Sequence, residues 1–214
     1  MKKIGIIGSG VVGQTLANGF IKAGYQVMIG TREPSKLDTW KENTNGEGKT
    51  GTFRDTASFG DLIVLATKGT AANKVLEMAG FENLKGKIVI DATNPISAAA
   101  PDNGVLKFFT NLNKSLMEEL QELVPDAKFV KAFNSVGSAF MVDPKFSSKP
   151  TMFICGNDPE SKKEVSRILE QFGWEAADFG GVESARAIEP LCMLWCIPGM
   201  LHNEWTHAFK LLKR

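Results

Sequence analysis

The chain is poor in the side chains that most enzymes use as acids, bases or metal ligands. It has one tyrosine, two histidines and three cysteines among its 214 residues. Tyr25 stands at the start of a predicted strand, away from the carboxyl edge where parallel sheets bind ligands. This position excludes the Tyr/Lys proton donor of short-chain dehydrogenases. His202 and His207 both fall in the last predicted helix, on different faces, so a histidine general acid is not expected.

The three cysteines predict neither disulfides nor a metal centre. Cys155, Cys192 and Cys196 do not pair off, as is typical of proteins in a reducing cytoplasm. Cys192 and Cys196 share one face of a predicted helix, but no second pair of ligands completes a zinc site. We therefore expect buried free thiols.

An excess of charge and long apolar runs are also missing. The net charge is +1, and no block of like charges occurs, so no nucleic-acid partner is expected. No apolar run approaches the roughly 18 residues of a transmembrane helix, so no membrane partner is expected either. The first predicted strand begins at Lys3, which leaves no room for a signal peptide. These features predict a cytoplasmic protein.

What the chain does contain is a glycine triplet between two apolar runs. Apolar residues 4–7 lead into G-x-G-x-x-G over residues 8–13, followed by a helical pattern at 15–23 and a second apolar run at 25–29. Strand, glycine turn, helix and strand within about 30 residues form the context in which this spacing marks a dinucleotide site.

Each glycine of the triplet has a distinct expected role. Gly8 lets the chain turn sharply out of the strand, Gly10 lets main-chain amides approach a diphosphate, and Gly13 lets the helix pack close to the sheet. The diphosphate is then expected at the N-terminus of the helix, where unpaired N–H groups and the helix dipole favour an anion.

The end of the second strand indicates which dinucleotide binds. An NAD site has Asp or Glu there, whereas an NADP site has Arg for the 2′-phosphate. This chain has Thr31 and Arg32, with Lys36 one helical turn later. Glu33 could serve as the ribose acid, but it stands at the expected start of a helix, where an acidic side chain is ordinary. We expect NADP(H).

The chain up to residue 136 alternates strands and helices. This alternation predicts an α/β fold with a parallel, doubly wound sheet of the Rossmann type. Further strands are predicted at 50–54, 61–67, 86–91 and 127–133, helices at 35–42, 56–59, 70–79 and 113–123, and a polar loop at 43–49.

The C-terminal part repeats this pattern on a smaller scale. Strands are predicted at 151–155 and 174–179, with helices at 159–172, 183–196 and 200–213, the last two parted by Pro198 and Gly199. We therefore predict an NADP-binding domain over residues 1–136 and a small α/β lobe over residues 137–214 packed on it. The apolar C-terminal helices are also compatible with a homodimer.

The shortage of acids and bases bears on the reaction. Carbonyl reduction normally needs a proton donor, although lysine or water could supply the proton. Direct hydride transfer between two redox cofactors needs only that their rings are held face to face. We predict no catalytic side chain.

Together these motifs resemble the NADP oxidoreductases that depend on the deazaflavin coenzyme F420. The chain is also similar to the cytosolic domain of the six-transmembrane ferric reductases. The resemblance covers nearly the whole chain, and its motifs are KIGIIGSGVVG at 3–13, GTR at 30–32, DATNP at 91–95, KAFN at 131–134 and ESARAIE at 183–189. It implies hydride transfer between NADPH and a deazaflavin or flavin acceptor.

The resemblance also implies site residues. Ser9, Gly10, Val11 and Val12 would hold the diphosphate, and Thr31, Arg32 and Lys36 the 2′-phosphate. The nicotinamide side would be lined by Ala66, Thr67 and Lys68, with Asn94 and Pro95 across the cleft and Asn134 and Arg186 toward the acceptor. Arg186 could instead form an ion pair with Glu183 or Glu189.

Three stretches depart from the family pattern and leave the acceptor open. They are Thr67-Lys68-Gly69, where the family often has a proline, the small-residue loop 96–111, and the apolar segment 191–200. Two alternatives follow. One is an NADPH-binding sensor without catalysis, and the other is an imine or small-carbonyl reductase.

Overall fold

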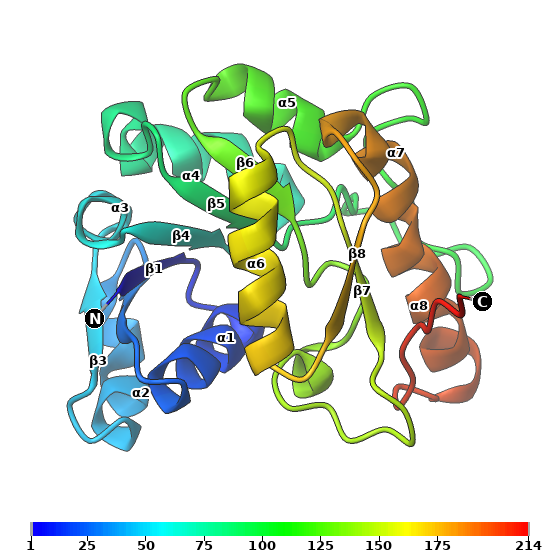
Figure 1. Cartoon of the computed structure of the whole chain (residues 1–214), viewed down its shortest axis with the longest axis horizontal. Helices are drawn as coiled ribbons and strands as arrows, with labels where there is room; N and C mark the ends of the chain where they lie inside the picture. The colour runs from blue at the N-terminus through cyan, green and yellow to red at the C-terminus, as the bar shows by residue number, and fades with distance from the viewer. Residues whose placement is uncertain (1, 214) are drawn as a thin grey trace.

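A six-stranded parallel sheet organises the computed structural model, which describes residues 2–213 (Figure 1). Its strand order is β3-β2-β1-β4-β5-β6, so the order reverses between β1 and β4. This arrangement confirms the predicted doubly wound α/β fold. The strands are β1 (Lys3–Ile7), β2 (Gln26–Gly30), β3 (Gly48–Gly51), β4 (Leu62–Leu65), β5 (Ile88–Asp91) and β6 (Lys128–Lys131).

Helices cover both faces of this sheet. Apolar side chains of α1 (Val11–Lys22) and α6 (Pro159–Gln171) pack on one face, where α6 crosses the front of Figure 1. The other face carries α3 (Phe53–Phe59), α4 (Ala72–Ala79) and α5 (Leu116–Leu123). The short α2 (Asp38–Asn43) adds Trp40 to the first of these two cores.

The central strands are mostly apolar because alternate side chains enter different cores. Ile6 and Val64 belong to the core under α1 and α6, whereas Ile7 and Leu65 belong to the core under α3, α4 and α5. A strand buried on both faces has no polar face to show in its sequence. This explains why β4 and β5 were predicted as continuous apolar runs.

The C-terminal part packs against the main sheet. Its strands β7 (Thr151–Ile154) and β8 (Glu175–Asp178) form a separate parallel pair, and an antiparallel bridge joins Lys131 at the end of β6 to Cys155. Phe133, Phe172 and Trp195 lie in one apolar cluster with the side chains of α1. The predicted division at residue 136 therefore crosses a shared core.

Several element boundaries differ from the prediction. β3 starts at Gly48, inside the predicted polar loop, and α3 starts at Phe53, inside the predicted strand. Thr52 ends the strand because it caps α3 together with Asp55, each side chain accepting a main-chain hydrogen bond of the other residue. Likewise α5 begins only after Ser115, which forms the same kind of capping box with Glu118.

The predicted last helix at 200–213 is wrong. Helix α8 (Pro190–His202) continues through Pro198 and ends at Asn203, whose φ of +56° is left-handed. Residues 203–213 then return along β7, where the Thr151 amide donates to the Phe209 carbonyl at 2.9 Å. The two histidines are therefore not in one helix. None of the described helices is both long and apolar enough to cross a bilayer.

Candidate functional site

The glycine turn has the geometry that its spacing predicts. Gly8 has a φ of +130°, and a Cβ there would overlap the Ala66 carbonyl. A Cβ on Gly13 would overlap the Gly8 carbonyl, so this position lets α1 approach β1. Gly10 faces open space, with no heavy atom within 4 Å of where its Cβ would be. The first amides of α1 are therefore accessible to an anion.

A cavity of about 580 Å³ opens in front of this turn. It lies at the carboxyl ends of β1, β2 and β4, where the strand order reverses and doubly wound sheets bind dinucleotides. We call this cavity the nucleotide cleft. Ten of the predicted residues line it: Gly8, Ser9, Gly10, Val11, Val12, Thr31, Arg32, Ala66, Thr67 and Lys68.

One end of the cleft is bordered by two arginines. Arg32 and Arg54 line an adjoining cavity of about 320 Å³ together with Thr31 and Phe53. The Thr31 hydroxyl accepts a hydrogen bond from Ser9 Oγ at 3.2 Å, which joins the ends of β1 and β2. This end of the cleft is thus cationic and carries hydroxyls, as recognition of a phosphate requires.

Arg54 is a residue that the sequence reasoning missed. Because β3 was predicted to run through residue 54, Arg54 was counted as part of a strand. It lies instead in the first turn of α3, just beyond the end of β3. Since β3 pairs with β2, its carboxyl end meets the same edge of the sheet as Arg32. A prediction that ended β3 before residue 54 would have placed Arg54 at this edge of the sheet.

Lys36 does not join this cationic end. It pairs with Glu33 at 2.8 Å, and neither residue lines a cavity of the cleft. The hydrogen bond from Lys36 lowers the pKa of Glu33 below its ordinary value. Of the three residues assigned to the 2′-phosphate, only Thr31 and Arg32 face the cleft. Glu33, the alternative ribose acid, faces Lys36.

The other end of the cleft opens into a cavity of about 400 Å³, which we call the side pocket. The two share Thr67, Lys68 and Ala92, and the side pocket adds Asn94 and loop residues 96–98. The Asn94 amide donates to the Asn134 carbonyl at 2.8 Å, so Asn134 lies behind Asn94 and fixes its orientation. Neither Asn134 nor Pro95 lines the side pocket itself.

Arg186 is held away from both cavities. Its guanidinium donates to both carboxylate oxygens of Glu118, with Nε at 3.0 and 3.1 Å. The predicted alternative pairs with Glu183 or Glu189 are wrong, because the partner is on α5. Hydrogen bonding by Arg186 lowers the pKa of Glu118 to about 2. Arg186 thus joins α7 (Ala185–Ile188) to α5 and lines neither the nucleotide cleft nor the side pocket.

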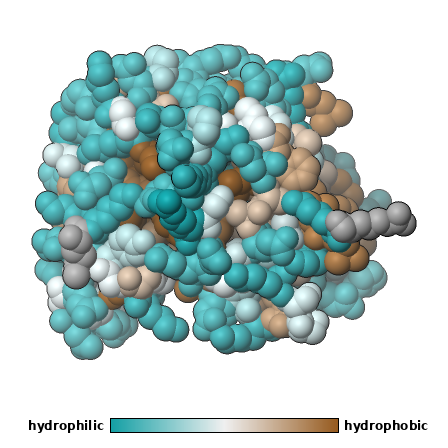
Figure 2. Space-filling view, in the orientation of Figure 1, coloured by the Kyte–Doolittle hydropathy of each residue, from teal (hydrophilic) through white to brown (hydrophobic). Residues whose placement is uncertain are grey.

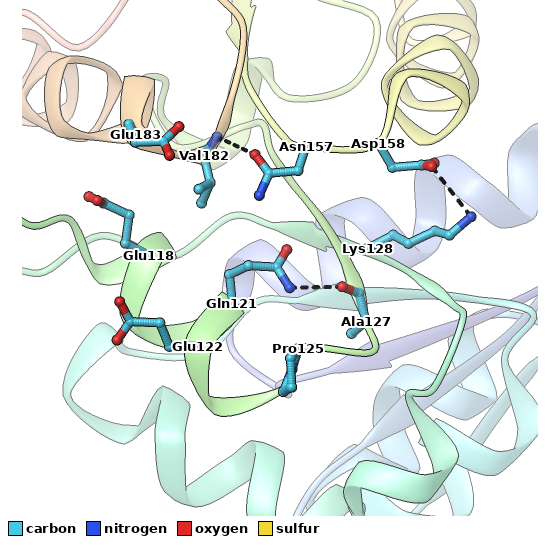
Figure 3. Close-up of a pocket in the computed structure, with 10 residues that line it drawn as sticks. All are labelled: Glu118, Gln121, Glu122, Pro125, Ala127, Lys128, Asn157, Asp158, Val182 and Glu183. Carbon is cyan, nitrogen blue, oxygen red and sulfur yellow. Dashed lines mark hydrogen bonds and ion pairs between the residues drawn. The ribbon is translucent and has the colours of Figure 1, made fainter.

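Glu118 and Glu183 border a third cavity, remote from the glycine turn (Figure 3). It has a volume of about 560 Å³ and lies between α5 and the residue pairs 157–158 and 182–183. Its lining shares no residue with the nucleotide cleft or the side pocket. The Asn157 side chain accepts from the Val182 amide, and Asp158 pairs with Lys128 (Figure 3).

A buried charge network lies at the ends of β5 and β6. Lys131 Nζ lies 2.7 Å from Asp91 and 2.9 Å from Glu189, and it donates to the Thr93 carbonyl at 3.0 Å. Burial lowers the pKa of Lys131, but the charges of Asp91 and Glu189 outweigh it and hold the pKa above its ordinary value. Glu189 also accepts from the amides of Leu116 and Met117 at the start of α5.

Few titratable side chains line the two cavities in the described part of the chain. Among residues 2–213, no His, Tyr, Cys, Asp or Glu lines the cleft or the side pocket. Tyr25 donates to Gln171, and His207 bonds the Trp195 carbonyl at 2.9 Å. In the same part of the chain, no group of three His, Cys, Asp or Glu could hold a metal ion.

Comparison with known proteins agrees with this geometry. The family model described as NADP oxidoreductase, coenzyme F420-dependent, matches residues 3–95. A solved structure of a candidate F420-dependent NADP reductase from Arthrobacter sp. FB24 superposes with a TM-score of 0.92 at 32% identity, over 100% of both chains. The chain belongs to this family.

Two curated proteins extend this family relationship. The F420-dependent NADP reductase of Methanocaldococcus jannaschii is 31% identical over 142 residues, which are 66% of this chain and 63% of that protein. Metalloreductase STEAP3 of Rattus norvegicus is 29% identical over 205 residues, or 93% of this chain. The chain spans only 39% of the length of that metalloreductase. Both parts of the predicted resemblance are therefore confirmed.

Proposed function

We propose that this member of the F420-dependent family is an oxidoreductase that transfers a hydride between NADPH and a deazaflavin- or flavin-type acceptor. The observation that supports it best is the continuity of two cavities. The glycine turn and an arginine border the first, and the second opens directly from it, with Lys68 as the one titratable residue in its described lining.

The residues of the cleft fit a phosphorylated dinucleotide. Open space at Gly10 leaves the α1 amides free to bind a diphosphate. Arg32 with Thr31 fits a 2′-phosphate, and the neighbouring Arg54 already pairs with Glu82. Thr67 Oγ1 is buried at the junction with the side pocket and has no hydrogen-bond partner among residues 2–213. A bound ligand would supply that partner.

When bound, NADPH supplies the hydride, so the chain has only to position two rings. Thr67 lines both the cleft and the side pocket. Asn94 lines the side pocket, and its contact with Asn134 keeps it in one orientation. Residues with no acid or base function are sufficient for such a reaction, because orientation of the two rings supplies most of what the protein contributes.

Anaerobic stopped-flow mixing tests the proposed reaction. NADPH-loaded protein is mixed with a deazaflavin, FMN or FAD, and NADPH absorbance is followed. We expect oxidation well above the rate without protein for at least one acceptor. Tight NADPH binding without acceleration by any of them would refute the reaction and would favour a sensor. Turnover with cyclic imines alone would assign the chain to imine reduction.

The nucleotide preference has its own test. Arg32→Glu removes a cation that has no ion-pair partner among residues 2–213 and adds a repulsive charge at the edge of the cleft. We expect NADPH binding to weaken about 100-fold, since the change costs roughly 3 kcal/mol. NADH affinity should change little. Lys36→Glu makes the same charge change at a side chain facing Glu33 and should cost far less. Equal losses for both nucleotides in Arg32→Glu would contradict this role.

A further inference from the structure

Lys68 is the cation of the side pocket. The pocket is lined by hydroxyls, an amide and small apolar side chains, and Lys68 is the one titratable residue in its described lining. It stands just beyond β4, where the side pocket and the nucleotide cleft share their wall. A ligand in either cavity would therefore lie next to Lys68.

Two cations in the lining of the cleft and its adjoining cavity are neutralised by a carboxylate, but Lys68 is not. Arg54 and Lys74 pair with Glu82 and Glu77 at 2.7 and 3.0 Å. Among residues 2–213, no carboxylate pairs with Lys68 or with Arg32. The cleft thus has one unpaired cation at each end of its described lining. Arg32 can pair with a 2′-phosphate. Lys68 can pair with a negative charge in the side pocket.

The proposed reaction creates a negative charge at the side pocket. A hydride carries two electrons and one hydrogen nucleus, so the nicotinamide is oxidised and the acceptor is reduced. One C–H bond breaks on the nicotinamide, and one C–H or N–H bond forms on the acceptor. No proton accompanies the hydride. A neutral flavin or deazaflavin ring therefore becomes an anion, which a nearby fixed cation stabilises without any proton transfer.

We infer that Lys68 and the side pocket form a binding site for a planar acceptor whose reduced ring is anionic. This inference rests on the proposed function and specifies the acceptor by the negative charge of its reduced ring. The Lys68 ammonium would bind the reduced ring more tightly than the oxidised ring, so it would favour hydride transfer toward the acceptor. Lys68 is then the residue that sets acceptor specificity, while Arg32 sets nucleotide specificity.

Equilibrium binding tests this inference without turnover. The protein is saturated with NADP⁺ and dialysed anaerobically, at mildly alkaline pH, against oxidised or reduced riboflavin and against both forms of its deazaflavin analogue. Neither compound carries a phosphate, so any charge preference reports the ring. We expect wild-type protein to bind the reduced rings about tenfold or more tightly than the oxidised rings, as a hydrogen bond to a charged group would produce.

Three variants separate Lys68 from general electrostatics. Lys68→Met should abolish the preference, and Lys68→Arg should keep most of it. Lys107→Met removes the same charge from the neighbouring loop, where the ammonium already pairs with Asp102 at 2.9 Å, and should keep the preference in full. The NADP⁺ concentration is chosen to saturate each of the four proteins, so the comparison reports the ring alone.

Three results would overturn the inference. The wild type could bind reduced and oxidised rings equally, or it could bind neither. The third is an unchanged ring preference in Lys68→Met, and a loss of NADP⁺ affinity in that variant would then assign Lys68 to the nucleotide. Because dialysis needs no turnover, it decides this point even if stopped-flow mixing refutes the proposed reaction.

Discussion

Two glycines of the turn separate nucleotide binding from folding. Gly10 has an ordinary φ of −73° and open space where a side chain would stand, whereas a Cβ on Gly13 overlaps the Gly8 carbonyl. We therefore expect Gly10→Val to unfold near the wild-type temperature but to bind NADPH at least about tenfold more weakly, because its side chain fills the space for the diphosphate.

Gly13→Val is the matched comparison for this prediction. It should lower the melting temperature clearly, since α1 must move away from β1 to relieve the overlap. Thermal unfolding and a fluorescence titration with NADPH measure both properties. Wild-type affinity in Gly10→Val would show that the diphosphate does not bind at this turn.

The sequence can predict the role of a single residue when that role depends on spacing within one local unit. Gly8, Gly10, Gly13 and Arg32 could be assigned because a strand, a turn and a helix position them within one unit. Arg186 could not, because its partner Glu118 is 68 positions away on another helix. Only the tertiary fold brings such a pair together.

At the scale of elements, the Glu118–Arg186 pair ties α7 to α5. The low pKa of Glu118, about 2, means that the folded state holds this carboxylate charged at a pH where the unfolded chain binds a proton. The resulting stability is complete above the ordinary glutamate pKa and is lost as the pH falls toward about 2. We expect a contribution of about 1–3 kcal/mol at neutral pH.

Urea unfolding of wild type and Glu118→Gln between neutral and acidic pH measures this contribution. The two proteins should differ most at neutral pH and converge as the pH falls. Parallel curves with a constant difference would contradict the assigned pKa. Arg186→Gln should lose similar stability and leave acceptor kinetics unchanged, because Arg186 does not line the cleft or the side pocket.

The buried charge network around Lys131 connects several elements. It connects the ends of β5 and β6, the start of α5 and the residue that precedes α8. Lys131→Met would leave two buried carboxylates without their cation, so we expect a loss of about 3–5 kcal/mol of unfolding free energy. Urea unfolding measures it. A loss below about 1 kcal/mol would show that the carboxylates accept protons at little cost.

Strands could be predicted from the sequence where burial on both faces gives a continuous run of apolar residues. The strands β1, β4 and β5 carry it. Prediction failed at residues 48–59, where the capping box of Thr52 and Asp55 decides the boundary, and at 203–213. In residues 203–213 the apolar pattern alone is compatible with a helix. In the structure, Gly199 leaves room for the Trp205 ring, and the chain folds back onto β7.

On the surface of the whole molecule, α8 exposes large apolar side chains. Leu194 and Leu201 are 55% and 50% exposed, and Val105 lies next to Gly104, which packs against Leu201. The hydrophobic side chains visible in Figure 2 gather on the side where α8 lies in Figure 1. Exposed apolar surface of this kind is typical of interfaces, so the predicted homodimer through the C-terminal helices stands as our proposal.

Light scattering after gel filtration tests the dimer. Wild-type protein should elute with twice the mass of one chain, and Leu194→Glu combined with Leu201→Glu should elute as a monomer. Neither leucine lines the nucleotide cleft, so the variant should bind NADPH as before. A monomeric wild type would refute the proposed dimer without affecting the assignment of the cleft.

We expect the glycine turn and the arginine beyond β2 together to select a phosphorylated dinucleotide. Calorimetric titration of the wild-type protein with NADPH and with NADH measures this selection. We predict that NADPH binds about 100-fold more tightly, as two charge-assisted contacts to the 2′-phosphate require. Equal affinity, tighter binding of NADH, or no binding of either nucleotide would contradict the account.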